Sequence, residues 1–196
     1  MLDVETASGI VRGVLVGDGM RAWRGIPYAA PPVGELRFRS PQPVSAWPGV
    51  RDAGRFGAAA PQFGKAGTNE DCLTLNVLAP AEPSEKPRPV MVFIHGGAFI
   101  LGTAATPLYD GAFLARAQDV VVVTVQYRFG AFGLLDFSQY STSDRTFDEN
   151  PGLSDMLAAL RWVQRNIAAF GGDPDNVTVF GESAGGSAVL TLLATP

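Results

Sequence analysis

The sequence predicts an α/β fold with a central, mostly parallel sheet in one domain of 196 residues. In its second half, strands that are apolar on both faces alternate with helical segments, as is typical of a parallel sheet covered on both sides. Near the end, a strand at Val177–Phe180, a turn at Gly181–Gly185 and an apolar helix at Ser187–Thr195 follow one another directly. The length suffices for one hydrophobic core, and no repeat or linker divides the chain.

The first 61 residues predict a small antiparallel hairpin followed by an irregular segment. Apolar residues alternate with polar ones up to Ile26, and Asp18-Gly19 marks the turn. Residues 27–61 are rich in Pro and Gly and are expected to wrap around the core. Three aromatic side chains are expected to tie this segment down: Tyr28, Phe38 and Trp47.

The second half predicts the strands and helices of the sheet. Further strands are expected at Leu73–Leu78, Val90–Ile94 and Val120–Tyr127. A short helix is expected at Asp110–Gln118, and a long one at Leu153–Phe170, where apolar residues recur every three to four positions. Pro151-Gly152 precede the long helix and Gly171-Gly172 end it, whereas Ser138–Glu149 is expected to be an exposed polar loop.

Composition excludes several classes of function. With 46 % apolar and 17 % charged residues the chain is globular, and a net charge of −4 argues against a nucleic-acid partner. No stretch reaches the ~18 apolar residues of a membrane span. The acidic start lacks the pattern of a signal peptide, which favours a cytoplasmic location. One cysteine and one histidine cannot form the usual zinc site or an intrachain disulfide, so no metal or cofactor is expected.

Gly181-Glu182-Ser183-Ala184-Gly185 fits the pattern G-x-S-x-G. Alone, the pattern is weak, because it should occur by chance in roughly one chain in seven of this composition. Its position between a strand and a helix is the context that a nucleophile elbow requires. We therefore expect a strained Ser183 with its hydroxyl held clear of the sheet. The N–H of Ala184, at a helix N-terminus, should point to where an oxyanion would form.

A second glycine-rich segment, His95-Gly96-Gly97-Ala98-Phe99, follows the strand Val90–Ile94. Small residues just beyond a strand end leave backbone N–H groups accessible. One or two of these groups would complete an oxyanion hole with Ala184. An ordinary glycine-rich turn is the alternative, and it is disfavoured by the G-x-S-x-G motif further along the chain.

These segments carry a family resemblance. The chain resembles the type B carboxylesterases, the family that also contains the cholinesterases, and within it the bacterial para-nitrobenzyl type. The matching blocks occur along the whole chain in the family's order: Arg24–Ala29, Glu70–Asn76, Tyr127–Gly130, Phe170–Pro174 and Phe180–Gly186.

The resemblance implies the N-terminal part of an α/β-hydrolase fold that hydrolyses small aliphatic or aryl esters through an acyl-enzyme. Ser183 would be the nucleophile, and the oxyanion donors would be the N–H groups of Gly97, Ala98 and Ala184. The resemblance also implies two buried ion pairs, Arg37 with Glu70 and Arg128 with Asp155. Surface charge is the alternative for both pairs.

The sequence departs from the family pattern in two ways. Cys72 is unpaired because Ala60 stands where the family usually has its partner cysteine. The tryptophan on which cholinesterases stack a quaternary ammonium is absent from the short loop after Pro61, so choline esters are not expected as preferred substrates.

The catalytic acid and histidine are missing, since the 13 residues from Ala184 to Pro196 contain neither. The chain is therefore expected to be inactive alone, as a truncated esterase. Its expected partner is the remaining C-terminal part or a second copy paired at a sheet edge. His95 as the base is disfavoured by its place at the foot of the glycine-rich segment. The alternatives left open are a non-catalytic cholinesterase-like binding module, an amidase and a lipase.

Overall fold

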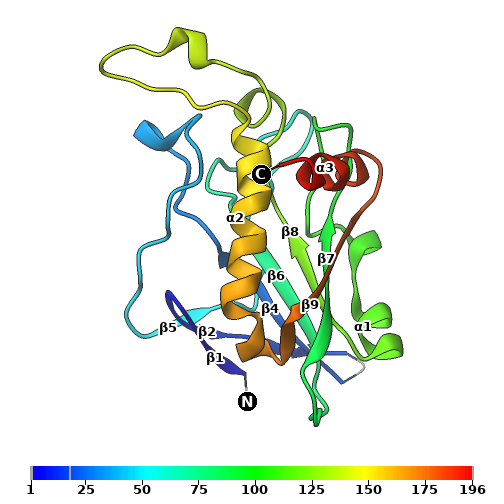
Figure 1. Cartoon of the computed structure of the whole chain (residues 1–196). Coiled ribbons are helices and arrows are strands. Elements are labelled where there is room, and N and C mark those ends of the chain that lie inside the picture. The colour runs from blue at the N-terminus through cyan, green and yellow to red at the C-terminus, as the bar shows by residue number, and fades with distance from the viewer. Residues whose placement is uncertain (1, 18, 196) are drawn as a thin grey trace.

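The computed structural model describes residues 2–17 and 19–195, and its centre is a six-stranded sheet (Figure 1). The strands lie in the order β3 (Val14–Val16), β4 (Met20–Pro27), β6 (Thr74–Pro80), β8 (Val121–Val125), β7 (Arg88–Ile94) and β9 (Gly172–Gly181). Strands β8, β7 and β9 run parallel, whereas β3, β4, β6 and β8 alternate in direction.

The sheet is therefore mixed, which corrects the expectation of a mostly parallel one. Parallel neighbours need a crossover connection, usually a helix. The first α-helix along the described chain, α1 (Ala112–Gln118), lies between β7 and β8. Within this sheet, only the described strands from β7 onward are linked through α-helices, and only these strands pair in parallel.

A separate three-stranded sheet lies beside the N-terminus. It consists of β1 (Asp3–Thr6), antiparallel to β2 (Gly9–Arg12), and of β5 (Val50–Asp52), parallel to β2. The N-terminal segment thus forms two hairpins, β1–β2 and β3–β4, where one was expected. Asp18 of the expected turn lies outside the described residues, and Gly19 has a φ of 70°.

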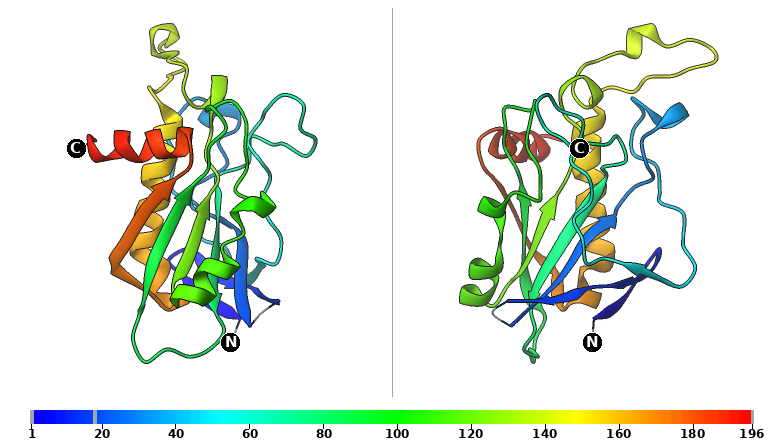
Figure 2. Two further views of the ribbon diagram at one scale, coloured as in Figure 1. Left: turned by 90° about the vertical axis from the view of Figure 1, so that its right-hand side faces the viewer. Right: turned by 180° about the vertical axis from the view of Figure 1, so that it is seen from behind.

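Helices cover both faces of the large sheet (Figures 1 and 2). Helix α1 packs on one face, and α2 (Pro151–Asn166) and α3 (Ala184–Leu193) pack on the other. The long expected helix continues after Asn166 as a 3₁₀ turn, Ile167–Phe170, which ends at Gly171 with a φ of 88°. Shorter 3₁₀ turns occur at Gly34–Leu36, Pro107–Tyr109, Gly130–Phe132 and Ser138–Tyr140.

The irregular segment from residue 28 onward is held in place by contacts of the three expected aromatic residues. The Tyr28 hydroxyl donates to the Gln126 carbonyl at 2.7 Å, and the Trp47 indole N–H donates to the Ile10 carbonyl at 3.0 Å. Phe38 stacks on Phe132 with ring centroids 5.6 Å apart. Among the described residues, no helix is both long and apolar enough to cross a membrane.

Candidate active site

A sharp turn between β9 and α3 carries Ser183, which is exposed. Ser183 has φ 53° and ψ −120°, a backbone conformation that is costly for any residue other than glycine. A Cβ on Gly181 would lie 2.5 Å from the Gly185 carbonyl carbon, and one on Gly185 would overlap the Ile94 carbonyl. The tight turn therefore requires glycine at both positions and forces the strain onto the serine between them.

The hydroxyl of Ser183 is not used by the helix that it precedes. Serine at an N-cap position usually accepts a hydrogen bond from the first helical turn. In the described structure the Ser183 side chain makes no such bond. The N–H of Ala184, the first residue of α3, has no acceptor within the helix, as at any helix N-terminus. A free hydroxyl and a free N–H thus lie next to each other.

The glycine-rich loop, residues 95–104, lies beside the Ser183 turn. Strands β7 and β9 are parallel neighbours with Ile94 opposite Gly181, so the segments after both strands emerge at one end of the sheet. A Cβ on Gly96 would be only 3.0 Å from the Cβ of Ser183. The loop then passes through three left-handed residues, Gly97, Ala98 and Phe99, with φ of 113°, 53° and 59°. Within the described residues, the N–H groups of Gly97 and Ala98 donate no hydrogen bond.

His95 is buried beneath this loop instead of facing Ser183. Its Nδ1 lies 2.8 Å from the Gly96 carbonyl oxygen and its Nε2 lies 3.4 Å from Nε2 of Gln126. The ring stacks on Tyr127 at 4.5 Å, and burial lowers the pKa of His95. Because both ring nitrogens have buried partners, neither is available as a base for Ser183.

Two residues near Ser183 were not singled out from the sequence. The Tyr109 hydroxyl donates to Oε2 of Glu182 at 3.4 Å, and the Tyr109 ring packs on Phe93 at 4.7 Å. Glu182 occupies a variable position of the G-x-S-x-G motif, and no local pattern links it to Tyr109, 73 residues away. Burial and the nearby Glu182 carboxylate raise the pKa of Tyr109.

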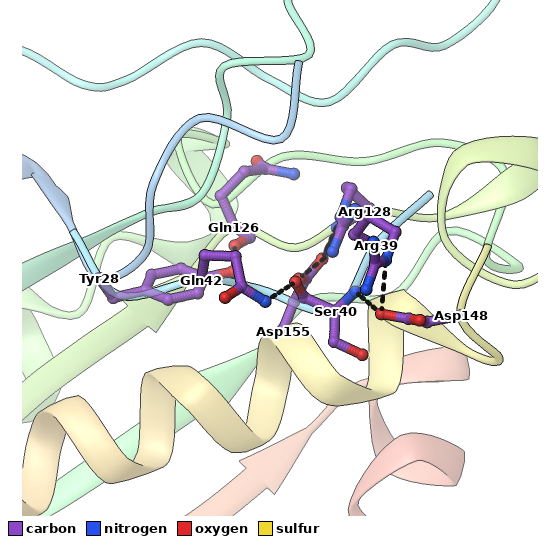
Figure 3. A network of polar contacts seen from close by, with 8 residues as sticks. All are labelled: Tyr28, Arg39, Ser40, Gln42, Gln126, Arg128, Asp148 and Asp155. Atoms are coloured by element: carbon purple, nitrogen blue, oxygen red, sulfur yellow. Dashed lines mark hydrogen bonds and ion pairs between the residues drawn. The ribbon is translucent and has the colours of Figure 1, made fainter. Parts of the chain in front are cut away.

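The two ion pairs differ in burial. Arg128 donates from Nε and Nη2 to Asp155 at 2.8 and 2.7 Å, and the two side chains are 3 % and 0 % exposed. This pair joins the chain after β8 to the first turns of α2 (Figure 3). Arg37 also makes two hydrogen bonds to Glu70, both 2.6 Å, but its side chain is 41 % exposed. The expectation that both pairs are buried is thus wrong for Arg37, because it lies on the outside of the wrapping segment.

Other polar contacts near the buried pair Arg128–Asp155 come from the segment that wraps around the core, residues 27–61. Asp148 accepts a hydrogen bond from the Ser40 N–H at 2.6 Å and one from Arg39 at 3.2 Å (Figure 3).

Cys72 is free and buried, and burial raises its pKa. Within residues 2–17 and 19–195, no three His, Cys, Asp or Glu side chains gather into a group that could hold a metal ion.

An apolar groove lies between α2 and β9. It has a volume of about 520 Å³ and is lined by Leu157 and Leu160 of α2, Val177 and Val179 of β9, and the polar residues Arg161, Gln164 and Arg165. Strand β9 is the last strand of the sheet, so among the described residues its outer edge has no strand partner.

A mixed sheet with helices on both faces, and a strand, tight serine turn and helix at its carboxyl end, define an α/β-hydrolase fold. Known proteins agree with this class. A sequence model of the Carboxylesterase family matches residues 2–196. A solved thermophilic PNB esterase superimposes with a TM-score of 0.92 at 49 % identity, covering 99 % of this chain and 41 % of that one. A Geobacillus stearothermophilus carboxylesterase gives a TM-score of 0.94 at 47 % identity, covering 100 % and 40 %.

The chain belongs to the carboxylesterase family. It is 50 % identical to the para-nitrobenzyl esterase of Bacillus subtilis (strain 168) over 202 residues, which cover 98 % of this chain and 40 % of that protein. It is 44 % identical to the cholinesterase of Mus musculus over 211 residues, or 98 % and 34 % of the two chains. The chain thus spans about two fifths or less of the length of these curated relatives.

Proposed function

We propose that Ser183 is the nucleophile of a carboxylic ester hydrolase that acts through an acyl-enzyme on small aliphatic or aryl esters. The observation that carries this proposal is the strained Ser183 turn, whose hydroxyl makes no capping bond and adjoins the glycine-rich loop. Strained residues persist only where the surrounding structure enforces them, and they cluster at functional sites. The exposed side chains of Ile100 and Leu101 on the same loop provide apolar contact for the substrate.

The N–H groups of Gly97, Ala98 and Ala184 form the oxyanion hole in this proposal, and the Ser183 turn is the nucleophile elbow. The first two groups are unpaired within the described residues, and the third lies at a helix N-terminus. One such donor contributes about 10²–10³-fold to kcat in comparable sites. Gly96 shapes the loop, because any side chain there would meet Ser183.

The general base and its orienting acid come from outside these 196 residues. The sequence contains a single histidine, which is buried with both ring nitrogens engaged. We therefore expect the chain alone to be almost inactive, retaining at most the ~10³–10⁴-fold acceleration that remains in serine hydrolases without their triad. A cytoplasmic location stays a prediction.

The partner in this proposal binds at the outer edge of β9. An unpaired strand edge is a template for pairing with another chain segment. The apolar groove between α2 and β9 adjoins this edge. The remaining part of the esterase or a second copy of the chain would cover both. Sedimentation of the isolated chain tests this, since a monodisperse 20.6 kDa monomer with cooperative unfolding would contradict it.

A chimera tests the proposed function. Residues 1–196 replace the matched 40 % of the Bacillus subtilis para-nitrobenzyl esterase, and hydrolysis of para-nitrophenyl butyrate is measured. We expect activity that Ser183→Ala abolishes and that Ser187→Ala, a neighbouring exposed serine on α3, leaves unchanged. Activity that survives Ser183→Ala would refute the proposal. A folded but inactive chimera would favour the alternative, a non-catalytic binding module.

A further inference from the structure

The glycine-rich loop is held from below by two residues that follow β8. Gln126 and Tyr127 are 3 % and 0 % exposed. The Tyr127 hydroxyl donates to the His95 carbonyl at 2.7 Å, at the start of the loop. The Gln126 Oε1 accepts from the Ala104 N–H at 3.1 Å, at its end, and the Gln126 Nε2 lies 3.4 Å from Nε2 of His95.

These contacts determine which nitrogen of His95 carries the proton. A carbonyl oxygen can only accept, so the 2.8 Å contact with the Gly96 oxygen places a proton on Nδ1. The Nε2 of a neutral ring is then an acceptor, and the amide nitrogen of Gln126 is a donor. The orientation of that amide is fixed independently, because its oxygen accepts from Ala104. All these contacts agree on the neutral Nδ1–H tautomer.

The tautomer in turn orients a peptide unit of the proposed oxyanion hole. The Gly96 carbonyl and the Gly97 N–H belong to one peptide group, and in a trans peptide they point in opposite directions. With its oxygen held inward by His95, this group directs the Gly97 N–H outward, on the side of Ser183. Gly102, with φ 126°, leaves room for the bond, since a Cβ there would lie 2.6 Å from both the Gly96 oxygen and Nδ1 of His95.

We propose that Gln126 is a positioning residue of the oxyanion hole, acting through the tautomer of His95. In the opposite tautomer Nε2 carries the proton and Nδ1 accepts. A flipped Gly96–Gly97 peptide would then donate its N–H to His95 and withdraw it from the substrate. Two adjacent glycines make such a flip inexpensive. The Gln126 amide prevents it, because its own N–H would face the N–H of Nε2. The catalytic meaning of this inference rests on the proposed function of the loop.

The single histidine allows a direct test by ¹⁵N NMR of the 196-residue chain, in which protonated and unprotonated ring nitrogens have well-separated shifts. In the wild type we expect a proton on Nδ1 and none on Nε2. In Gln126→Met the Nε2–H tautomer should become populated, and in Gln126→Glu, which keeps an acceptor for Ala104, Nε2 should be protonated. An unprotonated Nε2 in Gln126→Glu would overturn the inference, even if the Met variant folds poorly.

Binding of butylboronic acid to the chimera, which supplies the general base, measures the consequence, because this acid forms a tetrahedral adduct on a nucleophilic serine. In Gln126→Met, the apparent affinity should equal the intrinsic affinity multiplied by the fraction of molecules that keep the Nδ1–H tautomer. It should fall about threefold if a third of the molecules keep that tautomer. Gln62→Met is the matched control, because the Gln62 amide binds the Gly102 backbone in the same loop at 2.8 and 3.0 Å without touching His95. The control should leave the tautomer unchanged. Equal affinity losses in both variants, with one tautomer throughout, would mean that Gln126 is only a structural clamp.

The same experiment separates this inference from the proposed function. Ser183→Ala should abolish boronate binding and leave the His95 spectrum unchanged. If the chimera with the wild-type residues binds no boronate while His95 of the 196-residue chain responds as expected, the tautomer selection is supported and the proposed function fails. If the boronate binds through Ser183 and its affinity is the same in Gln126→Met despite a mixed tautomer, the positioning role fails and the function stands.

Discussion

Two adjacent glycines at the start of α3 should respond very differently to alanine. A Cβ on Gly185 would overlap the Ile94 carbonyl oxygen and lie 2.9 Å from the His95 oxygen. Both obstacles are backbone, so neither can rotate away. Moving α3 outward would disturb the register that pairs Ile94 with Gly181. A Cβ on Gly186 would lie 3.3 Å from the Gly181 carbonyl oxygen and 3.8 Å from its carbon, which is only mild crowding.

The expected costs follow from these contacts. Overpacking against fixed atoms typically costs 1–3 kcal/mol, so Gly185→Ala should destabilise the chain by about 3 kcal/mol. For a domain of this size that lowers Tm by about 6–12 °C. The free energy of unfolding of Gly186→Ala should stay within about 1 kcal/mol of the wild-type value. Mild crowding opposes the ~0.5–1 kcal/mol by which alanine stabilises a helix relative to glycine.

Urea and thermal unfolding followed by far-UV circular dichroism provide the comparison. The two variants differ from the wild type by the same single methyl group, so Gly186→Ala controls for any general effect of alanine on α3. A loss below about 1 kcal/mol in Gly185→Ala, or equal losses in the two variants, would refute the close packing of the Ser183 turn against the glycine-rich loop.

Three other predictions concern the supporting structure. Arg128→Met should cost about 3–5 kcal/mol, because the buried Asp155 carboxylate loses its cationic partner and keeps only the hydrogen bond from the backbone N–H of residue 128, whereas Arg37→Met should cost at most about 1 kcal/mol; equal losses in urea unfolding would contradict the difference in burial. Burial lowers the pKa of His95, so below about pH 6.5 the unfolded chain binds the proton more readily. The His95 contribution to stability should therefore be complete above that pH and lost as the pH falls, and an NMR titration of His95 with an ordinary pKa in the folded chain would contradict this. Cys72 should react with a thiol reagent only upon unfolding, because it is 0 % exposed; rapid reaction of the native chain would disprove its burial.

Local patterns predicted the elements that position the site. The apolar run at Val177–Phe180, followed at once by two glycines around a serine, was sufficient to predict the strand, the turn and the steric need for Gly181 and Gly185. The apolar periodicity of α2 and the glycines after it likewise placed that helix to within a few residues.

Non-local features escaped prediction. Strand direction depends on the connections, and the antiparallel half of the sheet follows from the absence of an α-helix before β7 in the described part of the chain. Strand β5 consists of three exposed residues without an apolar pattern. The contacts of Gln126 with His95 and of Tyr109 with Glu182 join residues that are 31 and 73 positions apart, so no local motif indicates them.

The most direct test of the central proposal is fluorophosphonate labelling of the chimera, followed by peptide mapping. We expect one adduct per molecule, located on Ser183, and no adduct in Ser183→Ala. Gly97→Ala should slow labelling, because Gly97 has φ 113° and its Cβ would overlap the Leu101 carbonyl oxygen, which displaces an oxyanion donor without removing the nucleophile. An adduct on another serine, or labelling that persists in Ser183→Ala, would contradict the proposal that Ser183 is the nucleophile.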